Sequence, residues 1–335
     1  MGRSAGRVPA TTGAVRNVAV VVALALGLCA VSARGVAAEP SPPARTNTAP
    51  VLLLHGYLMN SCPGTNANTT FASLITKLKA KGYAGPSVPI DYYACDSKGT
   101  NVQGYGDPNA YYPGGYYTAG AWGSYKGGNT NNTDLRHIAY QLAWYVYSAH
   151  SSKGQSVSIV GYSMGGLIAR WMLYGVQSHD PAFPPYLYVQ DMVTISTPHR
   201  GTDDGFKNVG WCPPSTQCKQ MLPGSPFLVE LAASGMNPQA TGGTDWTVLG
   251  DSPCDAIGKN PAGTTMDAGN VHKVSYYAPR ASTPNCYNHT SYLTDTSDQV
   301  DMPVRTSEPW NPTWVTGKGQ HSLARVISAL TSGTA

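Results

Sequence analysis

The sequence predicts one α/β domain, with a mainly parallel central sheet and helices on both faces. Short apolar runs that are typical of strands buried on both faces alternate with stretches whose apolar residues recur every three or four positions. One such run leads directly into a glycine-rich turn and then a helical pattern. The chain of 335 residues is 41% hydrophobic and only 12% charged, which excludes a disordered protein and allows a single large domain at residues 50–335.

The first residues, 1–38, have the three parts of a secretory signal peptide. An arginine-bearing start precedes an apolar run at 17–33, and small residues follow up to Ala38, after which cleavage is expected. The run is short for a membrane span, and no second apolar run of about 18 residues follows it. We therefore expect a secreted, extracellular protein without a stable membrane anchor.

The net charge of +4 arises in this same segment, which holds four arginines and no lysine, aspartate or glutamate. The rest of the chain carries 18 basic and 18 acidic residues. A neutral mature chain argues against nucleic acid or an acidic membrane as a partner bound by bulk charge. We expect a monomer.

Cleavage would also remove Cys29 and leave six cysteines in an oxidising compartment. An even number there favours three disulfides, and the spacings lack the paired CxxC pattern of a zinc site. Many pairings are open. We favour the sequential set, which is Cys62–Cys95, Cys212–Cys218 and Cys254–Cys286.

The remaining elements follow in order after an extended lead-in at 39–49, which is rich in Pro, Ala and Thr. Strands are predicted at 51–54, 87–92, 156–160, 189–195, 245–249 and 271–277. Helices are predicted at 70–81, from an N-cap at Asp134 to Val146, directly after Ser163, and at 321–330.

Two long segments without periodicity are candidate covers for a binding site. Residues 94–133 are rich in Gly, Tyr, Asn and Asp. The aromatic rings of this segment either line a binding surface or cover the body of the domain. Residues 200–243 form either a lid that opens at a lipid surface or an ordinary disulfide-braced excursion. The apolar residues of the second segment are Phe206, Trp211, Met221, Leu222, Phe227 and Leu228.

Residues 161–165, GYSMG, fit the pattern GxSxG between an apolar strand and a helical pattern. Glycine is needed on either side because the strand must reverse sharply into the helix, which brings backbone segments close and strains the central residue. Ser163 would then stand exposed at the start of the helix. The context predicts a nucleophile, because a plain glycine-rich turn does not require this arrangement.

A serine nucleophile requires a histidine base, a carboxylate that orients the base, and amides that stabilise the oxyanion. The amide of Met164, directly after the nucleophile, is the first candidate donor. The second should come from the loop after the first strand, where we assign the amide of Tyr57, with Leu58 as the alternative. His55 is expected to brace this loop without touching the substrate.

The motifs VLLLHGY, GYSMGG and STPHRGT, with LPGSPFLVEL at 222–231, resemble the α/β-hydrolase superfamily and, within it, the secreted lipases and esterases of bacteria, especially those of actinomycetes. The resemblance spans roughly residues 51–300. It implies the α/β-hydrolase fold and a chain order of serine, acid and histidine.

That order places the acid after the strand at 245–249 and the base after the strand at 271–277. Asp255, followed by a small and an apolar residue, resembles the acid of these lipases, and Asp251 is its rival. His289, followed by a Tyr-Leu pair after two residues, resembles the base, and His321 is its competitor. A Cys254–Cys286 disulfide would tie the two loops together.

We therefore expect a serine carboxylic-ester hydrolase, most simply a lipase that cleaves acylglycerol esters, in some cases at a lipid–water interface. The chemistry requires no cofactor, and no phosphate loop or dinucleotide motif is present in the sequence. A structural calcium occurs in some similar lipases, and no acidic cluster in the sequence specifies one. The alternatives are an acyltransferase that uses the same triad and a non-catalytic surface-binding module.

Overall fold

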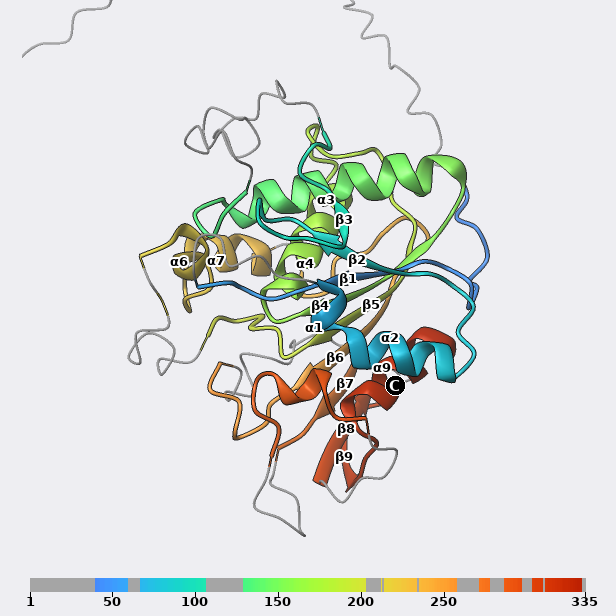
Figure 1. Cartoon of the computed structure of the whole chain (residues 1–335), viewed down its shortest axis with the longest axis vertical. Helices are drawn as coiled ribbons and strands as arrows, with labels where there is room; N and C mark the ends of the chain where they lie inside the picture. Colours follow the sequence, from blue (N-terminus) through green and yellow to red (C-terminus); the bar gives the residue numbers. More distant parts are fainter. Residues whose placement is uncertain are drawn as a thin grey trace, which may run out of the picture. The chain divides into compact units, whose positions relative to one another are not determined.

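The structure is a computed structural model of the whole chain (Figure 1). It describes residues 40–59, 67–106, 129–202, 212, 214–233, 235–257, 271–277, 286–296, 303–309 and 311–332. Contacts divide the chain into Met1–Ala38 and Glu39–Ala335, and every described residue lies in the second unit. The predicted signal peptide lies outside the described residues and stays a prediction.

The described strands form one sheet in the order β3-β2-β1-β4-β5-β6-β7-β8-β9. The strands from β3 to β7 pair in parallel, and β8 and β9 add an antiparallel hairpin at one edge. Their bounds are β1 Val51–Leu54, β2 Ser87–Asp91, β3 Thr100–Asn101, β4 Val157–Tyr162, β5 Val189–Ile195, β6 Asp245–Gly250, β7 His272–Ser275, β8 Pro303–Glu308 and β9 Asn311–Lys318. The predicted strands are all present, whereas the closing hairpin was not expected.

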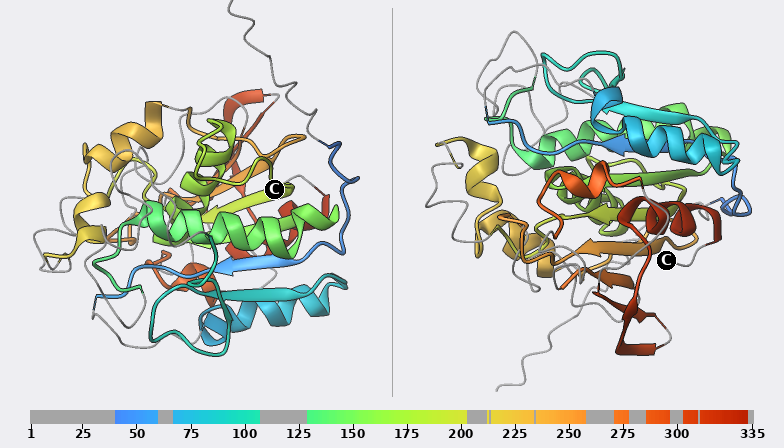
Figure 2. Two further views of the ribbon diagram at one scale, coloured as in Figure 1. Left: turned by 90° about the horizontal axis from the view of Figure 1, so that it is seen from above. Right: turned by 60° about the horizontal axis from the view of Figure 1, so that its bottom comes forward.

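Helices pack on both faces of this sheet because its central strands are apolar on both sides. The longer helices are α2 Ala72–Ala80, α3 Leu135–Ala149, α4 Met164–Gln177 and α9 Ser322–Ser332. The shorter ones are α1 Ala67–Thr70, η1 Ser151–Lys153, α6 Thr216–Gln220, α7 Pro226–Ala233 and η2 Ser291–Leu293. Figure 2 shows α2 and α9 on one side of the sheet and α3 and α4 on the other.

Two apolar cores result, one on each face. In β1, Leu52 and Leu54 face the core under α3 and α4, while Val51 and Leu53 face the core under α2 and α9. All four side chains are fully buried. This double burial explains why the strand reads as a continuous apolar run.

Helix α3 begins as the sequence predicts. The Asp134 carboxylate accepts a hydrogen bond from the amide of Arg136 (2.8 Å), which caps the first turn. The predicted stripe of Leu135, Ile138, Leu142 and Val146 is buried. The topology and these elements confirm the predicted α/β-hydrolase fold.

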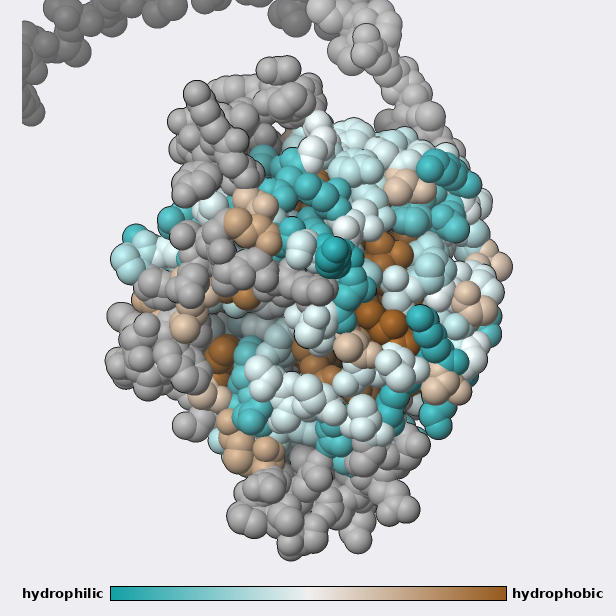
Figure 3. Space-filling view, viewed as in Figure 1, coloured by the Kyte–Doolittle hydropathy of each residue, from teal (hydrophilic) through white to brown (hydrophobic). Residues whose placement is uncertain are grey.

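On the face shown in Figure 3, the described residues form small brown patches among hydrophilic ones and no broad apolar area. Among the described residues, the large hydrophobic side chains that are exposed are Met59, Val229 and Val315. No helix of the described part of the chain is both long and apolar enough to cross a membrane.

His272 on β7 joins the parallel sheet to the terminal hairpin. Its Nε2 lies 3.2 Å from an oxygen of Asp245 on β6, and its Nδ1 contacts Glu308 on β8. Burial lowers the pKa of His272, but the two carboxylates outweigh burial and raise it above 6.5. Arg45 is a positive charge near this group, 3.8 Å from Asp245.

The raised pKa predicts a pH-dependent contribution to stability. The imidazolium is favoured in the folded state, so its contribution is complete below the unfolded pKa of 6.5 and is lost as the pH rises through the higher folded pKa. We expect His272→Gln to lower the free energy of unfolding more at about pH 5.5 than at about pH 8.5. Denaturant titrations across this range measure the difference, and equal losses at both ends would contradict the assignment.

Candidate active site

Ser163 lies at the sharp turn between β4 and α4. Its backbone adopts φ 54° and ψ −126°, a positive-φ conformation that is strained for a residue other than glycine. The glycines on either side make the turn possible, because a methyl group on Gly161 would lie 2.6 Å from the Cα of Gly166. The amide of Ser163 donates to the carbonyl of Ile195 (2.9 Å), which ties the turn to β5.

The histidine and the acid reach this serine from two later loops. His289 Nε2 lies 2.9 Å from Ser163 Oγ, and His289 Nδ1 lies 3.0 Å from Asp255 Oδ1. Asp255 follows β6 and His289 follows β7, so the three side chains meet at the carboxyl edge of the sheet. The Asp255 side chain is fully buried, whereas that of His289 is 16% exposed and can reach a ligand.

Asp255 is held in its ionised form by hydrogen bonds. Burial alone would raise its pKa, but the bond and charge of His289, a bond from Ser196 and the amide of Ile257 (2.9 Å) outweigh burial and lower it. An ionised carboxylate at Nδ1 favours the tautomer that leaves Nε2 free to accept a proton from Ser163.

Ser196 is a residue of this site that the sequence analysis did not single out. It follows β5, is fully buried and adopts φ 49°. Its hydroxyl donates to Asp255 Oδ2 and lies 3.0 Å from His289 Nδ1. Two signals were available: Ser196 is the first residue of the motif STPHRGT, and it follows a strand that lies in the chain between those of Ser163 and Asp255, where parallel-sheet sites gather.

The rival residues lie elsewhere. The His289 ring bonds to Asp255 and not to Asp251. Burial raises the pKa of the Tyr292 phenol, and the charges of Asp255 and then Asp251 raise it further. His321 contacts Asp295 and the hydroxyl of Tyr287 (3.1 Å), at the start of α9. Of the histidines that were not candidates, His199 is buried against Thr194 (3.0 Å), and His272 lies in the sheet.

The loop after β1 passes directly beside the serine. A methyl group on Gly56 would lie 3.0 Å from the Cβ of Ser163 and 3.4 Å from its hydroxyl oxygen. The Gly56 carbonyl accepts from His55 Nδ1 (2.9 Å) and from Tyr92 (3.3 Å). His55 is itself held by Asp96 (2.9 Å) and by stacking on Tyr92, so it braces the loop.

This bracing determines where the next amide points. The carbonyl of Gly56 and the amide of Tyr57 belong to one planar trans peptide and therefore face opposite ways. Because the carbonyl faces His55 and Tyr92, the Tyr57 amide faces away from them. Neither this amide nor that of Met164 donates to another described residue, whereas the Leu58 amide contacts the Tyr93 hydroxyl.

The disulfides Cys254–Cys286 and Cys212–Cys218 are present, with Cα–Cα distances of 5.6 and 5.4 Å. The first joins the loops that carry Asp255 and His289. Cys95 is also disulfide-bonded. Cys62, its predicted partner, lies outside the described residues.

A pocket of about 410 Å³ opens at Ser163 and His289. Its apolar lining comes from the loop after β1, from Ile257 and from Met221 of the predicted cover 200–243. Phe227 and Leu228 of that cover pack into the core. Phe206, Trp211 and most of the predicted cover 94–133 lie outside the described residues.

No cluster of three or more potential metal ligands occurs in the described part of the chain.

Residues 123–214 match the family described as "Putative serine esterase (DUF676)", a stretch that contains Ser163 and Ser196 but neither Asp255 nor His289. A comparison with curated protein sequences finds no match.

Several solved structures are similar at low identity. Lipase B of Aspergillus fumigatus is 16% identical, with 76% of this chain and 52% of that chain covered and a TM-score of 0.45. Phospholipase PlaB of Legionella pneumophila is 14% identical, with 56% and 35% covered and a TM-score of 0.33. The mature lipase BlEst2 of Bacillus licheniformis is 15% identical, with 63% and 69% covered and a TM-score of 0.33. The chain thus spans about half of the first protein and about a third of the second.

The contact between Ser196 and Asp255 yields a prediction. Ser196→Ala removes a hydrogen bond to a buried carboxylate, and we expect kcat for a reaction at Ser163 to fall about 10- to 100-fold with little change in KM. The matched control is Ser158→Ala, because Ser158 donates to buried Asp191 (2.6 Å) at the opposite end of β4. Equal kcat values for the two variants would show that Ser196 does not act on the site.

Proposed function

We propose that the protein is a serine carboxylic-ester hydrolase that forms an acyl-enzyme on Ser163. The observation that carries the proposal is the chain of contacts from Ser163 Oγ to His289 Nε2 (2.9 Å) and from His289 Nδ1 to Asp255 (3.0 Å). The strained turn that presents Ser163 supports the same role, because it places the hydroxyl at the helix start and at the pocket.

In the proposed reaction, His289 Nε2 accepts the proton of Ser163 as Oγ attacks the ester carbonyl carbon. The carbonyl oxygen becomes an oxyanion, which the amides of Tyr57 and Met164 stabilise, and Asp255 stabilises the imidazolium. The carbon–oxygen bond to the alcohol then breaks, and His289 returns its proton to the leaving alcohol. Water, deprotonated by His289, attacks the acyl-enzyme and releases the carboxylic acid and free Ser163. Side chains and backbone amides supply every group that this sequence of steps uses.

The proposed substrates are acylglycerol esters. Support comes from the apolar lining of the pocket, from the serine esterase family that matches residues 123–214, and from the lipase motifs of the sequence. We also propose that the protein acts outside the cell as a monomer. The signal-like residues 1–38 and the disulfides support secretion.

The nucleophile can be tested by labelling. A fluorophosphonate should modify one residue, Ser163, because only a serine activated by a base attacks phosphorus readily. Ser163→Ala should lose labelling and at least about 10³-fold in kcat. Mass spectrometry of the labelled peptide and ester hydrolysis assays measure both effects.

A matched pair of histidine variants separates the two candidate bases. His289→Ala should abolish labelling, whereas His321→Asn should keep it, because His321 contacts Asp295 and not Ser163.

For the nucleophile itself, full activity in Ser163→Ala would refute the proposed mechanism.

The substrate class is tested by comparing emulsified triolein with soluble p-nitrophenyl acetate at equal enzyme concentration. An apolar pocket predicts that long acyl chains are cleaved with the higher kcat/KM. Titration of released fatty acid provides the measurement. Activity on p-nitrophenyl acetate but not on triolein would indicate an esterase and contradict the lipase assignment.

A further inference from the structure

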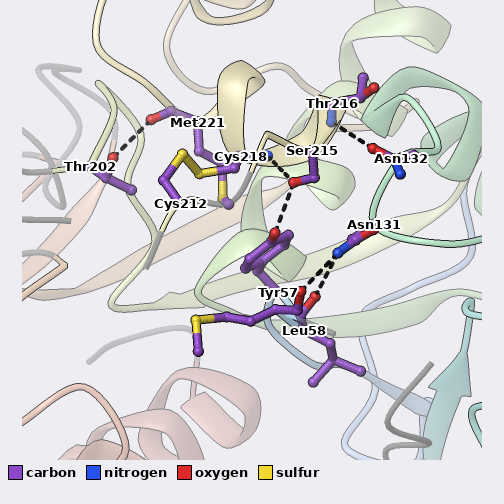
Figure 4. The surroundings of a disulfide bond; sticks show 11 residues. Tyr57, Leu58, Asn131, Asn132, Thr202, Cys212, Ser215, Thr216, Cys218 and Met221 are labelled. Carbon is purple, nitrogen blue, oxygen red and sulfur yellow. Dashed lines mark hydrogen bonds between the residues drawn. A yellow bond between two sulfur atoms is a disulfide. The ribbon is translucent and has the colours of Figure 1, made fainter. Parts of the chain in front are cut away.

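Tyr57 has two ends that face different parts of the site. Its amide belongs to the peptide beside Ser163, and its ring lines the pocket. Its hydroxyl reaches across to Ser215 Oγ at 2.8 Å, at the start of α6 (Figure 4). The side chain therefore connects the loop after β1 with a segment 158 residues later in the chain.

The loop that carries Tyr57 depends on such contacts for its shape. Residues 55–59 form no helix or strand, so no ladder of backbone bonds holds them. Tyr92 donates to the carbonyls of His55 and Gly56, and the Asn131 side chain donates to that of Met59 (3.0 Å). These contacts hold the loop before and after Tyr57, and the hydroxyl holds Tyr57 itself.

Ser215 is a rigid partner for this hydroxyl. It is 3% exposed, and its Oγ also accepts the amide of Cys218 (3.3 Å), so it caps α6. The Cys212–Cys218 disulfide closes the segment around it, and the amide of Thr216 donates to Asn132 (3.2 Å) (Figure 4). Because the first turn of α6 is held on both sides, the Oγ of Ser215 is held in place.

We propose that Ser215 is a positioning residue for the oxyanion hole, which acts through the Tyr57 hydroxyl. The bonds to the Gly56 carbonyl fix the direction of the Tyr57 amide. The bond from the Tyr57 hydroxyl to Ser215 holds the other end of the residue, so it restrains the position of this amide relative to the developing oxyanion. This inference rests on the proposed function, because it assigns the Tyr57 amide a role in ester hydrolysis. A donor of this kind acts mainly in the transition state, so its misplacement lowers kcat more than it raises KM.

Tyr57→Phe is the sharpest test, since it keeps the ring in the pocket and the backbone amide but removes the hydroxyl. We expect kcat to fall about 3- to 10-fold, as for the loss of one hydrogen bond, with KM within about 2-fold. A boronic-acid transition-state analogue should bind more weakly by the same factor as the loss in kcat/KM. Ser215→Ala should match these effects, and Ser215→Thr, which keeps a hydroxyl, should restore them.

The double variant Tyr57→Phe/Ser215→Ala should be no slower than Ser215→Ala, because both changes remove the same bond. The control is Tyr188→Phe, which removes a hydroxyl bond to Pro40 (2.9 Å) without contact to the pocket and should leave kcat unchanged. If Ser215→Ala does not fold because its helix cap is lost, Tyr57→Phe alone decides.

The outcomes separate the two proposals. Wild-type kcat in Tyr57→Phe, or additive effects in the double variant, would overturn the role of Ser215 while leaving hydrolysis by Ser163 intact. An unchanged affinity for the boronic acid would do the same. A wild-type protein that neither hydrolyses esters nor reacts with a fluorophosphonate would overturn the proposed function itself.

Discussion

The site depends on the strained, positive-φ backbone of Ser163. A conformation of this kind costs about 1–3 kcal/mol and persists only where the surroundings impose it. Here a fully buried strand enters the turn, a largely buried helix leaves it, and Gly161 and Gly166 approach too closely to carry side chains. The strain places the hydroxyl at the pocket, so the cores on both sides of the sheet maintain the position of one oxygen atom.

The parallel sheet then determines which loops can reach that oxygen. In such a sheet the carboxyl ends of the strands lie along one edge. The loop of Tyr57 follows β1, Ser196 follows β5, Asp255 follows β6 and His289 lies beyond β7. Residues from distant parts of the chain converge because each lies after a strand of the same direction.

These loops have little regular structure, so cross-links give them their shape. The Cys254–Cys286 disulfide joins the acid loop to the base loop. His321, the alternative candidate base, contacts Asp295 and Tyr287 in the segment that carries His289. Tyr57 and Ser215 make the corresponding link between the loop after β1 and α6. The site is therefore organised by pairs of side chains rather than by backbone ladders.

Local patterns in the sequence determined the strands, the main helices and the turn at Ser163, and the resemblance to the α/β-hydrolases made Asp255 and His289 candidates. Apolar period, glycine spacing and motif order are properties of neighbouring residues, so they can be read along the chain. The closing hairpin β8–β9, the approach of Ser196 to Asp255 and the contact of Tyr57 with Ser215 could not be read in this way. They join residues whose proximity arises only when the sheet has formed, and a serine at a strand end looks the same in sequence whether or not a carboxylate packs against it.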